Sequence, residues 1–125
     1  MSLEEAEFLR ERAYSFLGEA KRLFAEGKHD ICSFMLEQPC QLLLKYHLLV
    51  KVGTYPRTHS LYRLIRELAK LTPKVSGILK ERAVEPGSLE DAYVAASYLP
   101  RTYNREELER LMSTAEELFE ALSHG

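Results

Sequence analysis

The sequence predicts an all-α fold, an antiparallel up-and-down bundle of four to five main helices and some shorter ones. Apolar side chains recur every three to four residues, the period of an α-helix, and no segment shows the alternation of a β-strand. Caps, glycines and prolines separate these periodic segments by short connections. The chain has 125 residues and is 46% hydrophobic, enough for one core and therefore one domain over residues 1–125.

The first predicted helix opens with a capping box, Ser2 and Glu5, and extends to about Glu26, before Gly27. Its apolar positions keep the helical period: Ala6, Leu9, Ala13, Phe16, Leu17, Ala20 and Phe24.

The second predicted helix extends from about Asp30 to Gly53 and is apolar on most sides. Such a helix is either central in its domain or also buried against a second chain. Pro39 inside it removes one backbone hydrogen bond and predicts a kink. Cys32 and Cys40 are about 12 Å apart along the helix, beyond the reach of a disulfide, so both are expected to be reduced thiols.

The third predicted helix, from about His59 to Leu71, has two unlike faces. One stripe is apolar: Leu61, Leu64, Ile65, Leu68 and Leu71. The opposite stripe follows a spacing of four, three and four: His59, Arg63, Arg66 and Lys70. A histidine beside three cations suits an anion such as a phosphate.

The remaining segments complete the bundle. Thr72 and Pro73 start a short fourth helix, and another short helix is predicted over residues 88–98. The last helix opens with the capping box Asn104 and Glu107. Its apolar stripe is Leu108, Leu111, Met112, Ala115, Leu118, Phe119 and Leu122.

Charge is unevenly distributed along the chain. The formal net charge is −2, which gives no global argument for nucleic-acid binding. Residues 45–82, however, include nine lysines and arginines and only two carboxylates, so this segment has a net charge of +7. The remainder of the chain has a net charge of −9. Several tyrosines accompany these cations: Tyr55, Tyr62, Tyr93, Tyr98 and Tyr103. Tyrosine can stack on a base while arginine pairs with phosphate, although packing in the core or at its rim would also explain these rings.

Other chemistries find little support. Metal binding is not expected, because the chain lacks a Cys-x-x-Cys motif and a pair of histidines at helical spacing, and no cofactor is predicted. Metal-independent RNA cleavage is an alternative, with His59 as the base and Arg57 or Arg63 stabilising the phosphorane. A capping histidine beside a solvated basic face would explain the same residues.

The order of several segments resembles the HEPN domain family (higher eukaryote and prokaryote nucleotide-binding), in its small stand-alone archaeal and bacterial form. The segment at residues 8–18 is similar to the opening helix, and residues 27–38 to the Gly-x-Tyr-Asp turn and Gln-rich second helix. Leu44-Lys45 matches a Leu-Lys pair, and residues 56–61 look like Pro-x-Thr-His-x-Leu. Residues 97–101 resemble the tail motif, with Ser97 where the family has arginine.

The resemblance implies a helical bundle, usually a homodimer, that works beside a minimal nucleotidyltransferase in two-part or toxin–antitoxin systems. Ribonuclease members carry arginine, four to six residues, then histidine. Arg22 and His29 fit that spacing but lie in the first helix and across Gly27, so we interpret the match as chance.

The leading hypothesis is therefore a module that binds nucleotide or polynucleotide phosphate and acts with a nucleotidyltransferase partner. The predicted site comprises Lys45, Arg57, His59, Arg63, Arg66, Tyr98 and Arg101. The alternatives are a metal-independent ribonuclease toxin, with His59 catalytic, and a ligand-free structural homodimer joined through the apolar second helix. With no signal peptide or membrane-spanning stretch in the sequence, a cytoplasmic location without membrane partners is expected.

Overall fold

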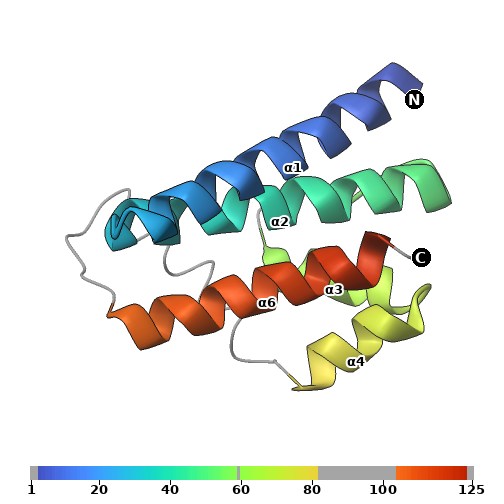
Figure 1. The fold of residues 1–125 in the computed structure, drawn as a ribbon. Helices are drawn as coiled ribbons and strands as arrows, with labels where there is room; N and C mark the ends of the chain where they lie inside the picture. Colours follow the sequence, from blue (N-terminus) through green and yellow to red (C-terminus); the bar gives the residue numbers. More distant parts are fainter. Residues whose placement is uncertain (1–2, 59, 82–103, 124–125) are drawn as a thin grey trace.

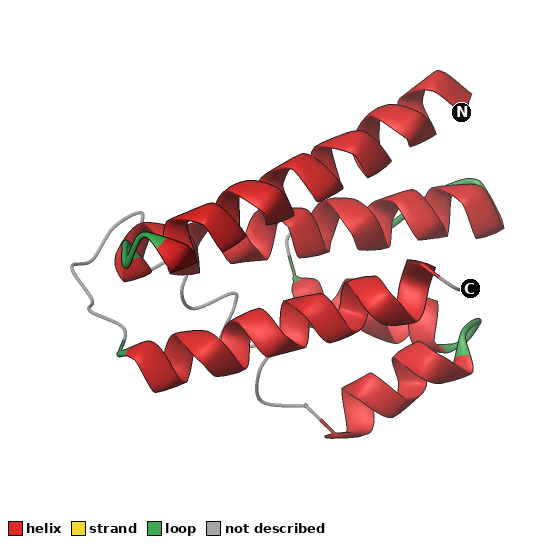
Figure 2. Cartoon of the chain, viewed as in Figure 1, coloured by secondary structure: helices red, strands yellow, loops and turns green. Residues whose placement is uncertain are grey.

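The structure is a computed structural model that describes residues 3–58, 60–81 and 104–123. These residues form five helices and no strand (Figures 1 and 2). In the numbering of Figure 1 the helices are α1 (Leu3–Ala25), α2 (His29–Val52), α3 (Leu61–Ala69), α4 (Pro73–Glu81) and α6 (Arg105–Ser123). The predicted all-α helical bundle is confirmed. The predicted short helix over residues 88–98 and the cap at Ser2 lie outside the described residues.

Helices α1 and α2 form a long antiparallel pair (Figure 1). The chain reverses at Gly27, whose φ of +75° lies in the left-handed region that favours glycine. The N–H of Gly27 donates to the carbonyl of Phe24 at 3.1 Å, and that of Lys28 donates to Leu23 at 2.9 Å. These bonds satisfy carbonyls at the end of α1, so the glycine predicted to end the helix does so.

Helix α2 is the centre of the molecule, because α1, α3 and α6 all pack against it. It continues through the buried Pro39, which therefore does not end the helix; a kink there stays a prediction. At its end, Gly53 adopts a φ of +83° and donates its N–H to the Leu49 carbonyl at 2.9 Å. The central position explains why the helix is apolar on most sides.

Helix α3 begins at Leu61, two residues later than predicted. Ser60 is extended, and its hydroxyl accepts a hydrogen bond from the N–H of Arg63 at 3.3 Å, which makes Ser60 the cap. The described part of the predicted basic stripe therefore starts at Arg63, and His59 lies outside the described residues. The helix also ends early, at Ala69, so Leu71 lies in the following turn and is 46% exposed instead of buried.

Helix α6 closes the core opposite α1 and runs antiparallel to it (Figure 1). The N–H of Glu107 donates to Oδ1 of Asn104 at 2.8 Å, which confirms the predicted cap. Every side chain of the apolar stripe predicted for this helix is buried. The fourth helix begins at Pro73, as predicted. The predicted side-chain cap is wrong, because the Thr72 hydroxyl is buried without a hydrogen-bond partner among the described residues.

Both cysteines are free and buried in α2, as expected for reduced thiols. The thiol of Cys32 donates to the Ala20 carbonyl at 3.1 Å, and burial raises its pKa to about 11. Burial, reinforced by the carboxylate of Glu37, also raises the pKa of Cys40. The two thiols are therefore protonated and unreactive at neutral pH. Among the described helices, none is long and apolar enough to cross a membrane.

Candidate phosphate-binding surface

The outward face of α3 presents the predicted arginines to solvent. Four apolar side chains anchor the inward face and are at most 2% exposed: Leu61, Leu64, Ile65 and Leu68. This anchoring fixes the rotation of the helix, so Arg63 and Arg66 lie on the solvent side and are exposed. No carboxylate of the described residues forms an ion pair with either arginine. Lys70, one turn further, is paired with Glu67 at 3.2 Å.

The segment before α3 is ordered by its own hydrogen bonds. The N–H of Thr58 donates to the Pro56 carbonyl at 2.9 Å, and that of Ser60 donates to the Thr58 hydroxyl at 3.0 Å. Arg57 is exposed in this turn, next to the N-terminus of α3, where the helix dipole favours an anion. Arg57 before α3 and Arg63 and Arg66 on its outward face are thus all exposed. We call these three arginines the α3 surface.

Lys45 lies on α2 and contacts a tyrosine. Its ammonium nitrogen is 5.7 Å from the centroid of the Tyr55 ring, within the range of a cation–π interaction. Both residues are half-buried, and Tyr55 also packs against the core. The structure describes no contact between Lys45 and the three arginines of the α3 surface. The other predicted site residues, His59, Tyr98 and Arg101, lie outside the described residues.

Comparison with known families identifies the chain. The HEPN domain family matches residues 6–124, nearly the whole sequence. The chain belongs to the HEPN domain family. No curated protein and no solved structure matched it significantly. As a HEPN domain, the chain is a helical module of a nucleotide-related or ribonuclease-like kind.

In this HEPN domain, the match between Arg22 and His29 and the arginine–histidine spacing of ribonuclease members has a structural explanation. The guanidinium of Arg22 binds the carboxylates of Glu19, at 2.7 Å, and Glu26. The hydrogen bond that Arg22 donates to the carboxylate of Glu19, more than any other contact, raises the pKa of Arg22. His29 is half-buried, with its ring 6.1 Å from that of Phe24. Arg22 is thus held within its own helix and turn, in agreement with the interpretation of the match as chance.

Metal chemistry finds no site in the part of the chain that the structure describes. Within residues 3–58, 60–81 and 104–123, no group of three histidine, cysteine, aspartate or glutamate side chains could hold an ion.

The sequence interpretation missed a second group of basic residues in this HEPN domain. Arg10, His47 and Lys51 line a pocket on another side of α2. The four-residue spacing of His47 and Lys51 was a signal that both share one face. The sequence could not show that Arg10 lies near His47 and Lys51. Arg10 belongs to α1, and the packing register of two helices is not visible in a single sequence.

Proposed function

We propose that this HEPN domain binds the phosphate groups of a nucleotide or of an RNA strand through the α3 surface. The observation that carries the proposal is a helix anchored by buried side chains on one face that leaves Arg63 and Arg66 exposed and without a described ion pair on the other. Guanidinium groups bind phosphate oxygens through paired hydrogen bonds. Among the described residues, no carboxylate has to be displaced before these two arginines bind an anion.

The exposure of these cations favours a strand over a single nucleotide. One ion contact at a solvent-exposed position contributes about 0–1 kcal/mol. Arg57, Arg63 and Arg66 together can engage successive phosphates, whose contributions add and release counterions. A basic residue next to the N-terminus of α3 and two on its outer face therefore suit a polyanion.

The setting we propose is a two-part system in which the protein, as a homodimer, acts beside a minimal nucleotidyltransferase in a toxin–antitoxin pair. Family membership supports this setting, and the uneven charge along the chain supports a distinct basic region for one partner. Light scattering after size exclusion would measure the dimer.

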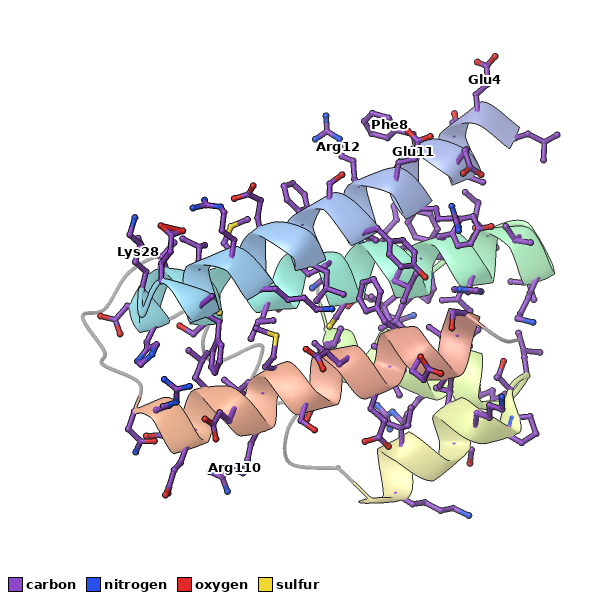
Figure 3. The ribbon with its side chains drawn as sticks, viewed as in Figure 1. Glu4, Phe8, Glu11, Arg12, Lys28 and Arg110 are labelled. Atoms are coloured by element: carbon purple, nitrogen blue, oxygen red, sulfur yellow. The ribbon has the colours of Figure 1, made fainter. Side chains whose placement is uncertain are left out.

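Binding of a fluorescently labelled single-stranded RNA, followed by anisotropy at low salt, tests the proposal. Replacing Arg63 and Arg66 by alanine should weaken binding about tenfold and reduce the salt slope by about 1.4. The matched control replaces Arg12 and Arg110 by alanine, which removes the same charge from exposed positions on α1 and α6 (Figure 3). Equal effects of the two double substitutions would contradict the proposal.

The same protein and RNA samples also distinguish a binding module from the alternative, a metal-independent ribonuclease. RNA that stays intact with the protein in the presence of EDTA indicates a binding module. Cleavage under these conditions that disappears in His59→Ala would establish the metal-independent ribonuclease instead.

A further inference from the structure

A pocket of about 310 Å³ is lined by residues of α1, of the second half of α2 and of the C-terminal end of α6. Its polar lining comes from all three helices: Arg10 and Tyr14, then Tyr46, His47 and Lys51, then Ser123. The rest of the lining is aliphatic, and no carboxylate is among the described residues that line it. The volume is in the range of small-ligand sites, which combine apolar walls with a few polar groups.

We propose that this pocket, which we call the His47 pocket, binds a phosphate monoester. Arg10 and Lys51 supply positive charge for the phosphate, and tyrosine and serine hydroxyls and the His47 ring supply hydrogen-bonding groups. Leu43, Val50 and Leu122 form the aliphatic wall against which the organic group would pack. The combination of fixed cations and an apolar wall favours an ester over inorganic phosphate.

Packing already holds much of the pocket in place. The guanidinium carbon of Arg10 is 5.2 Å from the centroid of the Tyr14 ring. That ring meets the buried Phe119 edge to face, with centroids 5.1 Å apart. On the opposite wall the rings of Tyr46 and His47 also meet edge to face, at 4.9 Å. A ligand would therefore order few side chains on binding, which lowers the entropic cost.

The electrostatics of the pocket agree with this inference. Burial first, then the charges of Lys51 and Arg10, lower the pKa of His47 to about 4. The ionisable groups around the ring are Arg10 and Tyr14 from α1 and Tyr46 and Lys51 from α2, while α6 contributes the neutral Leu122 and Ser123. Glu7, outside the lining, pairs with Arg10 at 3.4 Å in an exposed contact. An anion in the pocket would offset the two cations and raise the pKa of His47.

The His47 pocket is separate from the α3 surface. Leu43, His47 and Val50 recur at helical spacing and share one face of α2, whereas Lys45 lies on the other side, at Tyr55. None of the described side chains that line the pocket belongs to α3. The two proposals can therefore fail independently.

The test is a titration of the isotope-labelled full chain with phenyl phosphate and with inorganic phosphate at pH 7, followed by NMR. We expect saturable shifts at His47, Lys51 and Ser123, a rise in the pKa of His47, and about tenfold tighter binding of the ester. Arg10→Gln and Lys51→Gln should each weaken binding about tenfold. The matched control is Lys21→Gln, at an exposed position of α1, which should bind as the unmodified protein does.

Three results would overturn the inference: no saturable shift at His47, equal binding of the two probes, or equal effects of Lys51→Gln and Lys21→Gln. Circular dichroism establishes that each variant is folded, which is expected because the replaced side chains are exposed. The double substitution Arg63→Ala/Arg66→Ala should leave phenyl phosphate binding unchanged. A loss there would place the anion on the α3 surface and also overturn the inference.

Discussion

The two cationic regions of this HEPN domain differ in how their side chains are held. On the α3 surface the helix backbone is anchored by buried leucines, but Arg63 and Arg66 extend into solvent. In the His47 pocket, Arg10 lies over Tyr14, and Tyr14 packs on Phe119 in the core. Exposed cations on the outward face of a helix suit a long anion through several weak contacts, whereas positioned groups in a pocket suit one small anion. A basic side chain thus suits a different ligand depending on whether its neighbours hold it against the core.

The largest expected effect comes from breaking that coupling. Phe119 is 5% exposed, so Phe119→Ala leaves a cavity and should destabilise the protein by about 3–5 kcal/mol. Urea denaturation measures the change. The matched comparison is Arg63→Ala/Arg66→Ala, whose exposed side chains should change stability by no more than about 0.5 kcal/mol each. If the two variants lost similar amounts of stability, the arginines of the α3 surface would also contribute to the packing of the core.

The second prediction concerns pH. The pKa of His47 in the folded protein, about 4, is below its ordinary value of 6.5. Between pH 6.5 and pH 4, His47 is therefore protonated in the unfolded chain but neutral in the folded protein. Stability supplied by neutral His47 is therefore complete above about pH 6.5 and is lost as the pH falls toward 4. At pH 5 the loss should be about 1–2 kcal/mol, since the half-buried ring is partly screened.

His47→Gln isolates this effect from the carboxylates that titrate at lower pH. Urea denaturation at pH 7 and pH 5 should show a smaller loss of stability in the variant than in the unmodified protein. Parallel losses in both proteins would mean that His47 titrates normally, and that the cations of the pocket do not act on it.

The third prediction compares the ligands of the two regions. If Arg57, Arg63 and Arg66 each neutralise one phosphate of a single strand, RNA affinity should fall about 20-fold between 50 and 200 mM salt. Binding of phenyl phosphate in the His47 pocket should fall less than about threefold, because a small ligand with one phosphate carries no condensed counterions that binding would release. Fluorescence anisotropy and NMR titrations at both salt concentrations give the two slopes. If RNA binding and phenyl phosphate binding depended equally on salt, the proposed difference between the α3 surface and the His47 pocket would be wrong.

The sequence predicted the fold well because its signals are local. The caps at Asn104 and the glycines at 27 and 53 mark helix ends through hydrogen bonds among near neighbours. The apolar stripe of α6 is buried as its period predicts. The predicted start of α3 was wrong because the sequence offers several polar residues that could precede the helix. The structure shows that the hydroxyl of Ser60 accepts the N–H of Arg63 and caps the helix.

The site was less accessible to sequence reasoning. The exposed arginines of α3 follow from its periodicity, and the structure places Arg63 and Arg66 as expected. The contact of Lys45 with Tyr55 and the meeting of Arg10 with His47 depend on how helices and turns pack, which no local pattern encodes. Periodicity shows which face of a helix is exposed, but not which residues of another helix lie opposite.

The smallest effect concerns the cap that positions the α3 surface. Ser60→Ala removes the acceptor for the N–H of Arg63 and should cost about 1 kcal/mol of stability, or about 4 °C in Tm. Ser15→Ala, at an exposed position inside α1, is the matched control and should be neutral or slightly stabilising. Because none of the described side chains that line the His47 pocket belongs to α3, phenyl phosphate binding should not change, while RNA binding should weaken as the first turn of α3 frays. If Ser60→Ala weakened both ligands equally, the two regions would share one cooperative unit, and the separation between an anchored pocket and a free surface would not hold.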